Sequence, residues 1–129
     1  MRKALFFLCL TLAASIAISC SKDKKGPEVY AIEYYTSLIN NDYAAYADGM
    51  EGKKSLPADY REQFINLSRQ YANKLNKTHS GLDTILVSKC MLNKDEDMAN
   101  VFLELCFNDS TKEAVVVPMV KKDNLWLMK

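Results

Sequence analysis

The residues that could transfer a proton are one histidine and a few carboxylates. His79, the only histidine, lies in the connection between a predicted helix and a predicted strand, with Asp83 close to it in sequence. A histidine can act as a general base when a carboxylate orients its ring. Asp83 alone is weak evidence for such a pair. Glu104 lies on the strand face opposite the predicted core and Glu33 on the polar side of its helix, so we predict no catalytic residue.

Metal-binding residues are equally sparse. His79, Cys90 and Cys106 lack the spacing of a compact ligand set. The acidic turn at residues 95–97 lacks the glycine and the distal glutamate of a calcium-binding loop. The sequence therefore predicts no metal site, and it indicates no cofactor.

Two of the four cysteines, Cys90 and Cys106, lie in predicted neighbouring strands. In an exported protein such a pair invites a disulfide. In the simplest register of the hairpin, Cys90 faces Val101 and Cys106 lies on the other side of the sheet. A slip of one residue places Cys106 opposite Thr84, about 20 Å from Cys90 at about 3.3 Å per residue. Because a disulfide needs Cα atoms within about 7 Å, we predict that both cysteines are free.

Aromatic residues are the most promising binding groups. All seven tyrosines fall in predicted helices, and a tryptophan ends the last predicted strand. Rings with polar tips suit the wall of a small-molecule pocket. They equally suit a core whose hydroxyl groups reach the rim, because helical spacing alone explains their positions. The candidate pocket-lining residues are Tyr30, Tyr34, Tyr35, Tyr60 and Trp126.

The start of the chain has the pattern of an export signal. Arg2 and Lys3 precede a charge-free run over residues 4–18, which is typical of a secretory signal peptide. The segment Ala17-Ile18-Ser19-Cys20 resembles the lipobox of bacterial lipoproteins, although the family usually has leucine where this chain has Ala17. The resemblance implies that Cys20 receives a diacylglyceryl group and becomes the acylated N-terminus. Two alternatives are ordinary cleavage after Ala17 and an uncleaved anchor, which needs about 20 apolar residues.

We therefore expect a lipoprotein signal peptide at residues 1–19, a lipidated tether at 20–27 and one domain at 28–129. The protein would be anchored by lipid to a membrane of the bacterial cell envelope, on the periplasmic face or the outer surface. Loss of Arg2 and Lys3 with the leader leaves 15 basic against 16 acidic side chains. That balance gives no basic footprint for a nucleic-acid partner.

Three helices are predicted in the first half of the domain. The first covers residues 28–40 and has a wide apolar arc, as expected for a helix covered on most sides. Asp42 is the predicted N-cap of a short helix over residues 43–48. Pro57 marks the start of the third helix and Gly81 its end. The third helix carries an apolar stripe formed by Tyr60, Phe64, Leu67, Tyr71 and Leu75.

The second half alternates with a period of two, which predicts strands over residues 83–92, 98–107, 112–121 and 125–129. Short polar turns join them into an antiparallel meander. Val101, Leu103, Leu105 and Phe107 share one face of the second strand, so this face is the predicted core. Helices followed by a four-stranded sheet predict an α+β domain of two layers.

The outer face of this sheet is unusually apolar. Phe102 and Cys106 share it with Glu104, and the next strand is apolar on both faces, whereas a solvated face should alternate with polar residues. Pro118 should force a bulge in that strand or leave a gap in its ladder. We predict a contact surface at Phe102 and Cys106, through which the domain can form a homodimer.

Three stretches of the chain resemble the nuclear transport factor 2-like superfamily. They are the tyrosine-rich helix running into residues 38–46, the alternating strand over residues 99–107, and the ending at residues 120–127. The similarity is greatest to the small lipoproteins of unknown function in that superfamily. It implies two to three helices closing one side of a curved sheet to form a cone, and domains of this kind often pair through their sheets.

The main hypothesis is a membrane-anchored envelope lipoprotein whose domain binds a small ligand or a partner protein without catalysis. One alternative is an enzyme acting on a small hydrophobic substrate in the cone, since enzymes of the superfamily place aspartate, histidine or tyrosine there. Another is a purely scaffolding subunit of the cell envelope, and an unknown envelope protein is a possible partner. A deep pocket would favour ligand binding or catalysis, and a filled cone would favour the scaffold.

Overall fold

A computed structural model describes residues 25–129. The predicted signal peptide, the predicted lipidation site Cys20 and the first part of the predicted tether lie outside these residues. Helices α1 (Pro27–Ile39), α2 (Tyr43–Asp48) and α3 (Ala58–His79) precede four strands. The strands are β1 (Leu82–Leu92), β2 (Met98–Phe107), β3 (Lys112–Lys122) and β4 (Leu125–Met128). They pair antiparallel in the order β1-β2-β3-β4, so the predicted α+β meander is confirmed.

The helices begin and end for local reasons that the sequence contains. Pro27 is the first residue of α1, where its missing N–H costs nothing. Asn41 has a φ of 62°, and this left-handed residue separates α1 from α2. The Asp42 carboxylate accepts a hydrogen bond from the backbone N–H of Ala45 at 3.2 Å, which confirms Asp42 as the predicted N-cap. No helix among residues 25–129 is long and apolar enough to cross a membrane.

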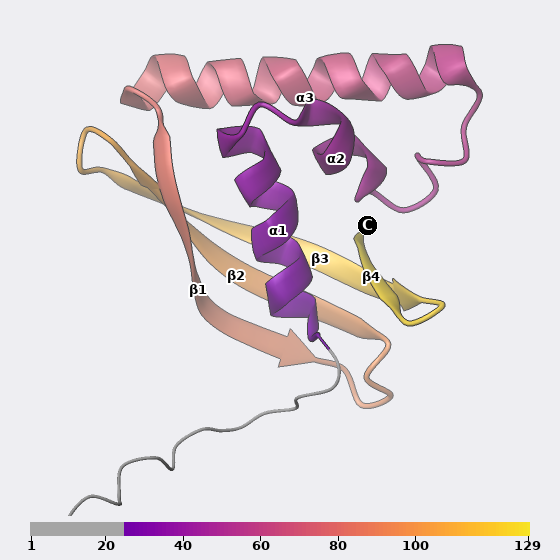
Figure 1. Cartoon of the computed structure of the whole chain (residues 1–129). Helices are drawn as coiled ribbons and strands as arrows, with labels where there is room; N and C mark the ends of the chain where they lie inside the picture. Colours follow the sequence, from indigo (N-terminus) through magenta and orange to yellow (C-terminus); the bar gives the residue numbers. More distant parts are fainter. Residues whose placement is uncertain (1–24) are drawn as a thin grey trace, which may run out of the picture.

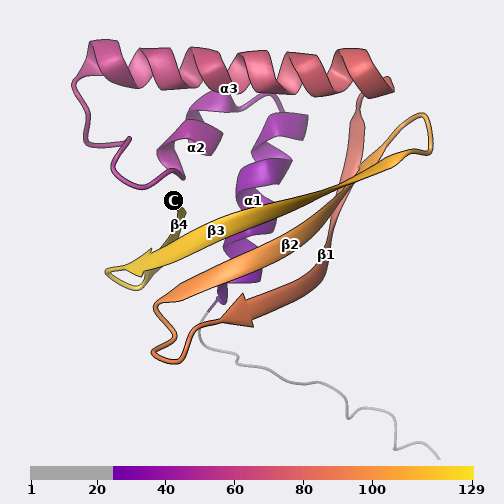
Figure 2. The same ribbon diagram turned by 180° about the vertical axis from the view of Figure 1, so that it is seen from behind.

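The helices cover one face of the twisted sheet. Figures 1 and 2 show α1 lying across this face, α3 running along one end of the sheet, and α2 between α3 and the C-terminus. The β2 side chains predicted to form the core, Val101, Leu103, Leu105 and Phe107, are all buried. Tyr35 of α1, Tyr46 of α2 and Tyr71 of α3 pack together with ring centroids 5.4 to 6.5 Å apart. Side chains from all three helices therefore pack together in the part of the interior next to α3.

The predicted apolar stripe of α3 is only partly correct. Leu75 is buried, but Tyr60 and Leu67 are 57% and 54% exposed. The buried side of α3 is the neighbouring stripe, which includes Ser68 and Ala72. The Ser68 hydroxyl donates to the Phe64 carbonyl at 2.8 Å, so a polar residue is satisfied within the helix. Two large apolar residues of the predicted stripe, Tyr60 and Leu67, therefore remain in solvent, whereas Phe64 and Tyr71 are half-buried.

The two cysteines are free, as predicted. Cys90 faces Val101 near the hairpin, and Cys106 faces Thr84 further along the same strand pair. Both registers considered for this hairpin therefore occur, joined by an irregularity between Val87 and Lys89. At that point β1 has one residue more than β2, which forms a β-bulge and increases the local bend of β1.

Pro118 forces no bulge, since the pairing of β2 with β3 has a continuous register. The Pro118 carbonyl accepts from the Lys129 N–H at 2.9 Å, so it faces the β4 side. In an antiparallel sheet the N–H and the carbonyl of one residue point to the same side, so the N–H that proline lacks would also face β4. The missing N–H is therefore on the β4 side, beyond the end of β4 at Met128, and the proline leaves no gap in the ladder between β2 and β3.

Candidate functional site

A cleft opens between α1, the loop that follows α2, and β4. Its volume is about 640 Å³, within the range of about 300–1,000 Å³ usual for small-molecule sites. We call it the α1–β4 cleft. It is lined by Tyr30, Glu33 and Tyr34 of α1, Ala45 and Asp48 of α2, Gly49, Met50, Gly52, Lys54 and Ser55 of the loop, and Leu125 and Leu127 of β4.

Tyr34 joins two walls of the cleft. Its hydroxyl donates to the Trp126 carbonyl at 2.6 Å, which ties α1 to β4. Its ring lies directly against Gly49, where a Cβ atom would come within 2.5 Å of a ring carbon. Burial, with smaller contributions from Tyr30 and Glu33, raises the pKa of Tyr34 to about 12. The hydroxyl therefore stays protonated and remains a donor at neutral pH.

The loop after α2 is fixed to the end of β4 by backbone hydrogen bonds. The Met128 N–H donates to the Gly49 carbonyl at 2.7 Å, and the Glu51 N–H donates to the Met128 carbonyl at 2.7 Å. The Lys122 ammonium lies 2.7 Å from the Glu51 carboxylate. These contacts hold the third wall of the cleft in place before any ligand binds.

Charged groups lie around an apolar interior. The Glu33 carboxylate pairs with Lys25 at 2.9 Å. Asp48 accepts two hydrogen bonds from Arg61 of α3, at 2.8 and 2.7 Å. Those hydrogen bonds lower the pKa of Asp48, and nearby Lys54 adds to the effect. The cleft can therefore hold a molecule with an apolar body and a polar end.

The five residues predicted to line a pocket lie in three different environments. Tyr30 and Tyr34 line the α1–β4 cleft. Tyr35 and Trp126 are buried in the core, and Tyr60 is exposed on α3, so these three lie outside the cleft. Sequence reasoning missed the wall formed by Gly49, Met50, Leu125 and Leu127. The signal that it could have used is the pairing of a glycine-containing loop with the last strand.

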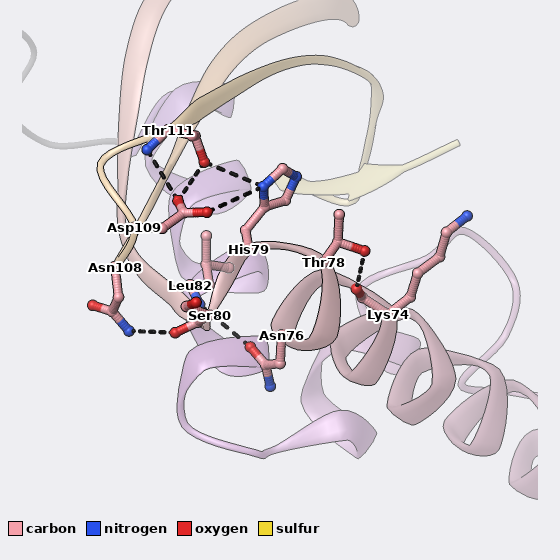
Figure 3. A network of polar contacts seen from close by, with 9 residues as sticks. All are labelled: Lys74, Asn76, Thr78, His79, Ser80, Leu82, Asn108, Asp109 and Thr111. Carbon is pink, nitrogen blue, oxygen red and sulfur yellow. Dashed lines mark hydrogen bonds and ion pairs between the residues drawn. The ribbon is translucent and has the colours of Figure 1, made fainter.

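A second group of polar side chains surrounds His79 at the end of α3 (Figure 3). The His79 Nδ1 atom lies 3.2 Å from the Thr111 hydroxyl and 3.7 Å from the Asp109 carboxylate. The imidazole ring stacks on Phe107 with centroids 4.2 Å apart. Hydrogen bonds from Thr111, the side-chain bond foremost, lower the pKa of Asp109.

Asp109 is the carboxylate partner that sequence reasoning did not find for His79. It comes from the turn between β2 and β3, about thirty positions further along the chain than its partner. Leu82 at the start of β1 pairs with Phe107 at the end of β2. The turn after Phe107 must therefore lie beside the end of α3, and this antiparallel pairing was the available signal.

His79 also borders a small cavity of about 210 Å³. The other lining residues are Tyr71, Lys74, Leu75, Thr78 and Glu113. A carboxylate that orients Nδ1 leaves Nε2 available to accept or donate a proton. Among residues 25–129, no three histidine, cysteine or acidic side chains are close enough to hold a metal ion.

The predicted contact residues lie on the outer face of the sheet. Phe102 and Cys106 are both half-buried. The Lys89 ammonium lies 5.1 Å from the centre of the Phe102 ring. Glu104 lies on the same face, 3.9 Å from Lys112, away from the cleft and from the His79 cavity.

Comparison with known proteins relates the chain to one fold. No protein-family model matches it, and no curated protein does. It is similar to the crystal structure of a Campylobacter jejuni protein named as an NTF2-like transpeptidase, with a TM-score of 0.64 and 19% identity. The match covers 81% of this chain and 97% of that chain. The predicted nuclear transport factor 2-like fold is therefore confirmed.

Proposed function

We propose that this protein is a lipid-anchored envelope protein whose domain binds a small ligand in the α1–β4 cleft without catalysing a reaction. The cleft itself is the observation that carries the proposal. It has the volume of a small-molecule site and a wall that combines tyrosine rings with aliphatic side chains. Hydrogen bonds and a close-packed glycine hold its walls in place.

The ligand is amphiphilic. Met50, Leu125 and Leu127 offer apolar surface to its body. Its polar end meets charged groups of both signs, since Glu33, Asp48 and Lys54 all line the cleft. A purely hydrophobic ligand would leave these groups without solvent, which costs free energy.

A screen of native extracts tests ligand binding. The purified domain is expected to retain a small molecule that mass spectrometry identifies. The Tyr30→Ala variant should lose that molecule because it removes part of the cleft wall. Tyr60→Ala is the matched control, since Tyr60 lies outside the cleft. Equal retention by the two variants would place the ligand elsewhere.

The anchor is proposed from the leader and its cysteine, Cys20. A diacylglyceryl group would give stable attachment, whereas one acyl chain at about 0.8 kcal/mol per methylene holds only marginally. Labelled fatty acid should enter the wild-type chain, and Cys20→Ala should release the protein from membranes. A wild-type chain that never takes up the label would contradict lipidation.

A second candidate function is proton transfer at the His79 cavity, and the contact between His79 and Asp109 favours it. The arrangement differs from a nucleophile–histidine–carboxylate triad. Thr111 and Asp109 both approach the same ring nitrogen, whereas a triad uses the two nitrogens separately. General acid–base chemistry therefore suits this cavity better than acyl transfer. A retained molecule that the protein chemically alters, and that His79→Gln leaves unaltered, would favour this candidate.

The outer face of the sheet is the proposed surface for self-association. Val116 is exposed beside half-buried Phe102, and Leu86 is exposed beside Glu104 on the same face. Lys89 and Glu104 give the same face charges of both signs, so two copies can complement each other across a twofold axis. An envelope protein is the alternative partner, and the packed tyrosines between the helices are compatible with such a scaffolding role.

A further inference from the structure

The exposed apolar residues of the domain are not scattered evenly. Met91, Leu92 and Met98 are exposed around the turn between β1 and β2, and Val29 is exposed in the first turn of α1. The three residues beside the turn also border a groove of about 390 Å³. We call these four residues the apolar tip.

The apolar tip lies at the end of the molecule where the anchored segment enters. Figures 1 and 2 show the start of α1 beside the end of β1, at the opposite end of the molecule from α3. Glu28 of α1 lies near Cys90 of β1. Burial is the main cause that raises the pKa of the Cys90 thiol, and the nearby Glu28 carboxylate raises it further. Contacts between the two elements therefore bring Val29 to the same end as Met91.

The length of the tether limits how far this end can lie from a membrane. Lys25 follows Cys20 by five residues. At about 3.3–3.6 Å per residue, even a fully extended chain places Lys25 at most about 18 Å from the lipidated residue. This inference rests on the proposed anchor. Given that anchor, the short tether keeps the start of α1, and the apolar tip beside it, close to the lipid surface.

We propose that the apolar tip docks on the surface of a zwitterionic membrane and orients the domain with α3 away from the lipid. Exposed methionine and leucine side chains gain free energy when they enter the boundary between headgroups and acyl chains. The turn beside them carries Lys94 against Asp95, Glu96 and Asp97. The adjoining residues 22–28 carry three lysines against two acidic residues, and Lys129 borders the groove. The charges at this end therefore balance, so apolar insertion provides the contact.

The test uses the full lipidated chain on phosphatidylcholine vesicles, with tryptophan as the probe. Met91→Trp places a ring in the apolar tip. Leu67→Trp is the matched control because Leu67, on α3, is as exposed as Met91, at 54% and 52%. The native Trp126 is buried and contributes the same background to both variants.

Replacing the lipid with brominated phosphatidylcholine should lower the emission of Met91→Trp about twofold, because a ring at the membrane interface contacts the quencher. The emission of Leu67→Trp should stay unchanged, and added salt should not alter either result. Equal quenching of the two variants, or none in either, would overturn the proposal. Met98→Trp repeats the measurement if Met91→Trp does not fold.

Sedimentation of the vesicles separates this inference from the anchor. Wild-type chain that pellets with vesicles, together with Cys20→Ala chain that does not, supports the anchor independently of the tryptophan result. Pelleting without selective quenching of the tip would overturn the docking and leave the anchor intact. A wild-type chain that does not pellet would overturn both.

Discussion

Among single residues, Gly49 leaves the space that the Tyr34 ring needs in the wall of the cleft. Gly49 has a φ of −76°, which any residue can adopt, so its role is to leave space for the Tyr34 ring. Gly49→Ala should lower the free energy of unfolding by about 1–3 kcal/mol, the usual cost of overpacking. Urea denaturation measures this loss.

A double variant isolates the cause of that loss. In a Tyr34→Ala background the same Gly49→Ala change should cost less than about 0.5 kcal/mol, since the atoms that would collide are gone. An undiminished cost in this background would mean that Gly49 is required for another reason.

The buried tyrosines predict how stability depends on alkaline pH. Burial raises the pKa of Tyr34 to about 12, and it also raises the pKa values of Tyr35, Tyr46 and Tyr71. In the unfolded chain these groups ionise near their ordinary value of 10.0. The unfolded state therefore loses protons first, and the free energy of unfolding falls as the pH rises.

For Tyr34, this contribution is complete below pH 10 and is lost as the pH approaches about 12. Urea denaturation across this interval should show falling stability, with a shallower slope for Tyr34→Phe. A slope that Tyr34→Phe leaves unchanged would mean that this hydroxyl is not the titrating group.

Among the secondary-structure elements, the strands could be predicted more accurately than the long helix. The two faces of β2 follow from strict alternation, because Val101 and Leu103 can only be buried together on one face. The buried side of α3 could not be predicted as well. Its position depends on which elements α3 packs against, and in the structure Ser68 is buried and Leu67 exposed. Apolar periodicity contains no information on such a partner.

The same difference applies to the candidate sites. Tyr30 and Tyr34 could be proposed from their type, because aromatic residues in an amphipathic helix suit a pocket wall. The contact between His79 and Asp109 depends on strand register, which brings together residues far apart in sequence. The two cysteines were predictable as free because every register considered kept them apart.

The sheet gives a prediction about self-association. Sedimentation of the soluble domain, residues 21–129, should detect a dimer in the wild type. Phe102→Lys should abolish it, because a charge replaces the apolar group at the centre of the outer face. Leu67→Lys is the control, since Leu67 is exposed on α3. A dimer that Phe102→Lys leaves intact would place the interface elsewhere, and a wild-type monomer would leave an envelope protein as the partner.

In the molecule as a whole, the three proposed surfaces occupy different places, although α1 contributes to both the tip and the cleft. The apolar tip is at the start of α1 and the turn between β1 and β2, and the α1–β4 cleft lies between the helices and the last strand. The self-association surface is the outer face of the sheet, which the helices do not cover. A domain docked through its tip could therefore bind a ligand and a second copy at the same time.

Calorimetric titration with the molecule retained from native extracts tests the central claim most directly. We expect one equivalent to bind to the wild type. Leu127→Glu should weaken binding at least about tenfold, because a carboxylate replaces apolar surface of the cleft and loses water when the ligand's apolar body covers it. Leu67→Glu, with its side chain exposed on α3, should bind as the wild type does. Equal binding by both variants, or no binding by the wild type, would contradict a ligand site in the α1–β4 cleft.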